Sequence, residues 1–241
     1  MRYSHSIKIY KKRWHLLVAF ITVAAPFIYI FIFSEFTGVK TEQVFLDLGT
    51  SFMRVLVAYV ISVAAAIPLA FFLGQGKIGD FFLPVFDVLQ SFPSFALLPL
   101  LVIWFGIGNA AAIFFLVATM IWPVLFSVLS SLRLSRKDLE EAAFIFGARG
   151  WKKMFLFTLP LSLPGLITGS IVGIGEGWEA IVGAEIIGIT PGIGGFLNSA
   201  SNRGDIPVLT FGIIALLLFL FTLNKLIWIP LLKRSHDYAH E

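Results

Sequence analysis

The sequence predicts an all-α, polytopic membrane protein with six transmembrane helices. The first observation is composition: 58% of the 241 residues are hydrophobic and 13% are charged, whereas soluble domains carry about 25% charged residues. The second is a series of long apolar windows, and the third is the concentration of positive charge on alternate connections between them. The windows leave no room for a soluble catalytic domain, so residues 1–241 are predicted to form a single transmembrane domain.

Six apolar windows define the predicted spans. Each is long enough to cross a hydrocarbon core of roughly 30 Å as a helix that rises about 1.5 Å per residue. The windows lie at about 14–33, 52–73, 83–105, 110–132, 155–175 and 208–232. The first is longer than the apolar region of a signal peptide and runs into Ser34 and Glu35 rather than a small-residue cleavage site, so we expect it to remain as a span.

The predicted orientation follows from lysine and arginine. Fourteen of the 18 basic side chains lie before the first window, after the sixth, or in the connections after the second and fourth windows. The connections 34–51, 106–109 and 176–207 hold only Lys40 and Arg203. Because positive charge is retained on the cytoplasmic side, we expect the N- and C-termini and the loop 133–157 to be cytoplasmic. The protein is then a multi-pass protein of the cell membrane.

Two connections on the opposite side are longer than turns. Residues 34–51 are expected to contain a short helix lying along the membrane surface, with Val44, Phe45 and Leu48 on one face. Residues 176–207 are too apolar for a solvated loop. We expect a helix continuing from the fifth span, a turn at 191–195, and a re-entrant or interfacial piece. Irregular backbone at membrane depth must be buried in protein or line an aqueous cavity, so this segment is a candidate for the solute pathway.

The cytoplasmic loop has the pattern of a short amphipathic helix. Ser135 and Asp138 are spaced as a capping box at its start. Gly147 is expected to end it. Its apolar stripe consists of Leu139, Ala142, Ala143 and Phe146. From these residues alone, two interpretations stay open: the helix lies on lipid head groups, or it inserts into a groove on another protein, where the small alanines permit close approach and Glu140 and Glu141 find basic partners.

The spacing within this loop resembles a known motif. Glu141-Ala142-Ala143, Gly147 and Leu159-Pro160 stand at the offsets of the EAA loop found in permease subunits of ATP-binding-cassette (ABC) importers, with Phe157 at the usual aliphatic position. Further stretches resemble the nitrate, sulfonate, taurine and bicarbonate branch of these permeases. They are Phe52-Met53-Arg54-Val55, Leu98-Pro99-Leu100, Trp104 to Gly108, Gly183-Ala184-Glu185 and Gly192-Ile193-Gly194. Ser91 precedes Phe92-Pro93, where many relatives carry a basic residue ahead of that proline.

The resemblance implies a fold like that of a type I ABC importer and a set of partners. Such permeases pair as dimers, bind two cytoplasmic ATPase subunits and receive solute from an extracytoplasmic binding protein. The chain has no GxxxxGK[ST] phosphate loop, so this chain is expected to bind no cofactor and ATP to be used by the partner ATPase. The residues implied to dock on the ATPase are Glu140, Glu141, Ala142, Ala143, Phe146 and Gly147.

Polar side chains within or beside the spans are candidates for the translocation path. An ionisable residue at the bilayer centre costs roughly 2.5–3.5 kcal/mol on insertion scales, so its retention marks a pathway or a pair. The candidates are Arg54, Glu176, Trp178, Glu179 and Glu185. The glutamates are either an outer gate or a solvated rim that pairs with Arg203, and Arg54 either lines the route or anchors a helix at the head groups.

Other classes of protein fit the sequence less well. A secondary transporter or channel is the main alternative, but it would need no ATPase-docking loop. A membrane-embedded enzyme would need clustered catalytic side chains, whereas the four histidines lie at the two ends of the chain and cysteine is absent. We find no pattern for a metal or for nucleic acid. The sequence leaves the solute open.

Overall fold

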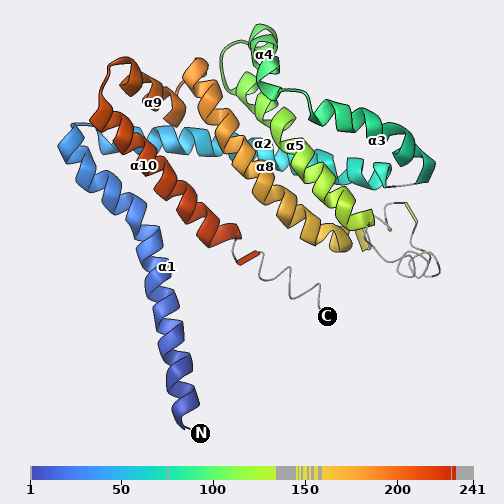
Figure 1. Ribbon diagram of the computed structural model, residues 1–241, viewed down its shortest axis with the longest axis horizontal. Helices are drawn as coiled ribbons and strands as arrows, with labels where there is room; N and C mark the ends of the chain where they lie inside the picture. Colours follow the sequence, from blue (N-terminus) through green and yellow to red (C-terminus); the bar gives the residue numbers. More distant parts are fainter. Residues whose placement is uncertain are drawn as a thin grey trace.

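The computed structural model describes residues 2–74, 76–133, 145, 147, 149–150, 152, 155–156, 159–228 and 230–231, with the backbone alone at 2–19 and 76–80. These described residues form helices and short turns without a strand, which confirms the all-α prediction. The helices α5, α8 and α10 run in roughly the same direction, α2 crosses them, and the first half of α1 diverges from the others (Figure 1). In chain order they are α1 (Arg2–Thr37), α2 (Thr41–Leu73), α3 (Gly76–Gln90), the 3-10 turn η1 (Ser94–Leu97), α4 (Leu98–Phe105), α5 (Asn109–Arg133), α8 (Leu159–Ile187), α9 (Ile193–Asn202), α10 (Ile206–Leu223) and the π-helical turn η3 (Asn224–Trp228).

The helices provide five or six membrane spans. Among the described residues, α1 from Phe20, α2, α5, α8 and α10 with η3 are each long and apolar enough to cross a bilayer. A sixth span arises if Phe81–Gln90 and Ser94–Phe105 cross together, although these two pieces are bent by 81°. The predicted number of spans is therefore matched when the bent pair counts as one.

The prediction of one continuous helix at 83–105 is wrong. The chain leaves the helix at Ser91–Pro93, where Pro93 has an extended backbone (φ −66°, ψ 105°). Proline has no backbone N–H to donate to a helical hydrogen bond, and its ring collides with the preceding turn. The third predicted span is thus split into α3 on one side of Pro93 and η1 with α4 on the other.

The short surface helix expected within 34–51 is also wrong as a separate element. Gly38 turns the chain with a φ of +67°, and α2 then runs without interruption from Thr41 into the membrane span. Val44 and Leu48 are buried, and the buried face continues through Ser51, Val55 and Ala58. Because this spacing of three and four residues keeps one face turned to the bundle, nothing in the pattern ends the helix at residue 51.

The centre of the bundle is the pair α5 and α8. Four glycines of α8 at four-residue intervals face α5 and allow the two backbones to approach closely: Gly165, Gly169, Gly173 and Gly177. A Cβ at Gly169 would lie 2.6 Å from the carbonyl oxygen of Pro123 and 2.8 Å from the Cα of Val124. Since helices in lipid associate through close packing of small residues, this stripe holds α8 against α5.

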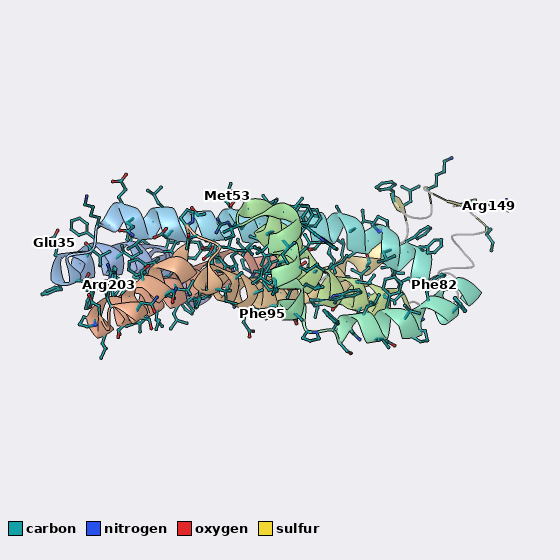
Figure 2. All side chains as sticks on the ribbon, turned by 90° about the horizontal axis from the view of Figure 1, so that it is seen from above. Glu35, Met53, Phe82, Phe95, Arg149 and Arg203 are labelled. Atoms are coloured by element: carbon teal, nitrogen blue, oxygen red, sulfur yellow. The ribbon has the colours of Figure 1, made fainter. Side chains whose placement is uncertain are left out.

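The bundle has two distinct ends. Glu35 and Arg203 lie at one end, and Phe82 and Arg149 lie at the opposite end (Figure 2). The first end also carries α9, beside the end of α8 and the start of α10 (Figure 1). The segment 176–207 follows its prediction in order but not in bounds: α8 continues to Ile187 and the second piece is α9, whose residues Ile193, Phe196 and Leu197 are buried. The turn lies at 188–192 rather than 191–195, because α9 already begins at Ile193.

Candidate functional site

A buried ion pair joins α2 to α8 within the spans. The Nη1 atom of Arg54 lies 2.8 Å from Oε1 of Glu185, and the two side chains are 5% and 0% exposed. An isolated charge in such surroundings would be strongly disfavoured. Arg54 and Glu185 therefore depend on each other and on the hydrogen bonds around them.

The Glu185 carboxylate also holds the start of α9. It accepts hydrogen bonds from the backbone N–H of Gly194 (2.9 Å) and from Ser51 Oγ (2.8 and 2.9 Å to its two oxygens). Ser51 Oγ in turn accepts from the backbone N–H of Ile193 (2.9 Å). The first N–H groups of a helix lack partners within the helix. The residue before α9 is Gly192, which has no side chain to cap the helix. Ser51 of α2 and Glu185 of α8 accept these N–H groups instead.

Arg54 reaches three parts of the chain. Besides Glu185, its Nη1 donates to the backbone carbonyl of Pro191 (2.6 Å), and its Nε donates to Oδ1 of Asn109 (2.8 Å). Asn109 is the first residue of α5, and Pro191 lies in the turn between α8 and α9. One guanidinium thus links α2, α5, α8 and the turn, because its donors form a rigid fork that can serve several acceptors at once.

Glycine is required where the turn wraps around Glu185. Gly192 has a φ of +154°, and a Cβ there would run into the Glu185 carboxylate. A Cβ at Gly194 would lie 2.8 Å from the Cβ of Glu185 and still closer to the carbonyl oxygen of Val182. The pattern Gly192-Ile193-Gly194 therefore allows the backbone N–H of Gly194 to reach the Glu185 carboxylate, which larger residues would cover.

The structure separates the predicted path residues into two groups. Arg54 and Glu185 lie together in the buried network, so the expectation that the glutamates pair with Arg203 is wrong for Glu185. Glu176 and Glu179 are exposed on α8. Trp178 is 5% exposed and packs edge-to-face on Phe219, with ring centroids 5.7 Å apart. Arg54 is 4% exposed, so its side chain binds protein partners rather than extending into the lipid head groups.

Sequence reasoning did not identify Ser51 and Asn109 as members of the site. A signal for Ser51 exists, because it stands three residues before Arg54 on the same face of an apolar helix. Asn109 directly follows Gly108 at the start of an apolar run, which is typical of a helix N-terminus. Neither signal reveals that both side chains meet the same ion pair.

A hollow lies beside the network, between α2 and the start of α5. Its volume is about 460 Å³. Three polar residues, Thr50, Arg54 and Asn109, contribute to its lining, and the remaining lining residues are Phe45, Leu46, Gly49, Met53, Val57 and Ile113. Leu46 and Met53 are 62% and 57% exposed, so the hollow opens on the outer surface of this chain.

Most of the predicted ATPase-docking residues lie outside the part of the chain that the structure describes. Glu140, Glu141, Ala142, Ala143 and Phe146 lie outside the described residues, as does the predicted cap at Ser135 and Asp138. Gly147 is described and has a φ of +74°. This conformation is rare for residues with a side chain, and it agrees with the turn predicted at this position.

Span-length helices that enclose a buried ion pair are typical of polytopic transport proteins. Residues 62–229 match the family described as the binding-protein-dependent transport system inner membrane component, and the chain belongs to this family. It is 30% identical over 190 residues to the taurine transport system permease protein TauC of Escherichia coli K12, covering 78% of this chain and 69% of that protein. It is 29% identical over 219 residues to the nitrate import permease protein NrtB of Leptolyngbya laminosa, covering 88% and 74%.

The chain is therefore an ABC importer permease of the nitrate, sulfonate and taurine branch and a multi-pass inner-membrane protein. This confirms the family inferred from the EAA spacing and sets aside the secondary transporter or channel. A third relative has a different kind of solute in its name: the riboflavin transport system permease protein RibX of Chloroflexus aurantiacus is 29% identical over 143 residues, covering 59% of this chain and 53% of that protein. Membership of the branch thus leaves the solute of this chain open.

Proposed function

We propose that this permease works as a homodimer whose cytoplasmic loops, residues 133–157, dock on two ATPase subunits. A binding protein delivers solute to the opposite end of the bundle. ATP is bound and hydrolysed by the ATPase partners, and this chain binds no cofactor and catalyses no reaction. Membership of an ABC importer family already implies ATPase and binding-protein partners. The number of permease copies and the docking surface are the proposed parts.

The observation that carries the proposal is the EAA spacing together with its place in the fold. Glu141-Ala142-Ala143 and Gly147 lie in the connection between the end of α5 at Arg133 and the start of α8 at Leu159. Arg149 of this connection lies at the end of the bundle opposite Glu35 and Arg203 (Figure 2). The connection is rich in Lys and Arg, which supports a cytoplasmic location for it and for both termini.

The docking role is tested with the full chain expressed together with its ATPase. Glu141→Arg reverses the charge that we expect to meet basic residues, and Gly147→Leu places a side chain at a φ that leucine strongly disfavours. Both variants should lose co-purification with the ATPase and lose transport while still reaching the membrane. Glu35→Arg is the matched control, since it makes the same change on an exposed residue at the opposite end. Intact assembly and transport in both loop variants would show that the docking role is wrong.

The copy number is tested separately by native mass spectrometry of the purified complex. A homodimer predicts two copies of the 26.7 kDa chain for every two ATPase subunits. One copy together with a different permease chain would contradict the homodimer and leave the docking role standing.

A further inference from the structure

We propose that the groove between α2, α8 and α10 binds one acyl chain of an anionic phospholipid, whose polar end is held by Asn224, Lys225 and Trp228. This inference goes beyond the proposed function, because neither docking of the ATPase nor delivery of solute depends on it. Three properties of the groove point to this occupant: its shape, its unpaired hydrogen-bond donors and an uncompensated positive charge.

The groove is apolar and has the length of one leaflet of the bilayer. Its volume is about 360 Å³. It follows α10 and η3 from Leu220 to Leu231, a rise of about 16 Å at 1.5 Å per residue, which is close to half of a hydrocarbon core of roughly 30 Å. At its rim Leu56, Ile227 and Leu231 are exposed, so the groove opens on the outer surface of the chain. A helix about 10 Å across is too wide for this volume, whereas a single extended acyl chain is not.

Two donors that line the groove have no acceptor. Trp228 is 9% exposed, and within the part of the chain that the structure describes neither its indole N–H nor the amide of Asn224 has a hydrogen-bond partner. Tyr59 also lines the groove, but its hydroxyl is already bonded to Ser170. An N–H group without an acceptor is costly in hydrocarbon, which offers none. A phospholipid brings an acceptor with the chain, because its acyl chain ends in an ester carbonyl.

The same end of the groove carries a positive charge without a counter-charge. Lys225 lies in η3, at the end of the last span. Its Nζ donates to Oγ1 of Thr22 (2.8 Å), and no described carboxylate pairs with it. Since an ammonium group has three donors, a phosphate could accept the others. Lys233 and Arg234 follow shortly afterwards in the sequence, and basic residues beside a span attract anionic lipids. The charge therefore favours an anionic over a zwitterionic head group.

The test uses the full chain with its ATPase in lipid nanodiscs that contain a phosphatidylglycerol with a photoactivatable diazirine on its acyl chain. After illumination, mass spectrometry locates the crosslinked residues. Phosphatidylcholine with identical chains measures the preference for the anionic head group. Gly175→Phe is designed to fill the groove, which Gly175 lines and where a Cβ at this position meets nothing within 4 Å. Gly49→Phe is the matched control, because Gly49 is equally open but lies outside the groove.

We expect the crosslinks to concentrate on the segments of α2, α8 and α10 that line the groove. Gly175→Phe should abolish most of them, and Gly49→Phe should leave them unchanged. Phosphatidylglycerol should crosslink about fivefold more than phosphatidylcholine, which corresponds to the attraction of one basic side chain for an anionic lipid. Lys225→Met should remove this preference without changing the yield with phosphatidylcholine. Asn224→Leu combined with Trp228→Phe should lower the yield with both lipids, because the ester carbonyl loses its donors.

Crosslinks spread evenly over the lipid-facing surface, or an unchanged yield in Gly175→Phe, would overturn the acyl-chain site. A groove that gives no crosslink because a second copy covers it would overturn the site as well. Equal yields with the two lipids would overturn the role of Lys225. Co-purification with the ATPase is measured in every preparation, so that a variant that fails to fold is recognised. If Gly175→Phe fails in this way, the double variant of Asn224 and Trp228 decides the question.

Discussion

The carboxylate of Glu185 can be removed by replacement with alanine, which leaves the guanidinium of Arg54 buried without its counter-charge. Breaking a buried ion pair from one side costs about 3–5 kcal/mol. The same change removes an acceptor from the backbone N–H of Gly194 and so uncaps α9, a loss of roughly 1 kcal/mol that overlaps with the first. For a domain of this size, we expect the melting temperature to fall by roughly 10 °C.

The measurement is thermal unfolding of the purified full chain, followed by the loss of its monodisperse peak in size-exclusion chromatography after heating. Limited proteolysis gives a second readout, because the turn at 188–192 should become accessible when α9 loses its attachment. Glu179→Ala is the matched control: it removes a glutamate from the same helix, but an exposed one, and should change the stability by less than about 0.5 kcal/mol.

A double variant separates the charge from the cap. Arg54→Met with Glu185→Met removes both charges, so no uncompensated charge remains in the bundle. We expect this double variant to melt above Glu185→Ala, although below the unsubstituted chain, since the carbonyl of Pro191 and the N–H of Gly194 lose their partners. The reasoning would be refuted if Glu185→Ala melted with the unsubstituted chain, or if the double variant melted below Glu185→Ala.

Three further predictions concern the packing around this network. Gly169→Ala should destabilise the chain by about 1–3 kcal/mol, because its Cβ would collide with the α5 backbone. Gly175→Ala, where a Cβ meets nothing within 4 Å, should instead stabilise the chain by up to about 1 kcal/mol. Both changes are measured as shifts in melting temperature. Gly192→Ala should mimic Glu185→Ala in the proteolysis assay. Gly188→Ala, at a φ of +144° but with open space around its Cβ, should cost only the backbone strain of about 1–3 kcal/mol. Tyr59→Phe removes a 2.7 Å hydrogen bond to Ser170 and should cost about 0.5–1.5 kcal/mol in the same thermal assay, since Ser170 keeps its bond to the carbonyl of Leu166.

Apolar periodicity predicted where the chain crosses the membrane, because the length and composition of a span are local properties. The same periodicity did not predict where the helices break or begin. Pro93 splits the third window, and the buried positions from Val44 onward extend α2 beyond its predicted start. A hydropathy window averages over such single residues, whereas the helix responds to each backbone hydrogen bond.

The partners in the buried network could not be predicted from the sequence. Arg54 and Glu185 are 131 residues apart, and Glu176, Glu179 and Glu185 all follow the fifth span at similar distance along the chain. Which of the three glutamates is buried becomes clear only when α8 is packed on α5. The glycine face of α8 lies against α5 and so determines which glutamate points into the bundle. The glycines at 192 and 194 were predicted as turn residues, but their contact with the Glu185 carboxylate depends on tertiary packing.

The close fit of α8 on α5 has a mechanical consequence. The helix α8 begins at Leu159, just after the proposed docking loop. From there to Glu185, whose carboxylate caps α9, it spans about 39 Å at 1.5 Å per residue. A helix with its backbone wedged against its neighbour transmits displacement along its axis instead of absorbing it by bending. A displacement of the chain near Leu159 would therefore move Glu185 at the opposite end of the helix. Because Glu185 is hydrogen-bonded to Gly194, α9 would move with it. The far end of this stiff helix is thus joined to α2 by the salt bridge to Arg54 and to α9 by the hydrogen bond from Gly194.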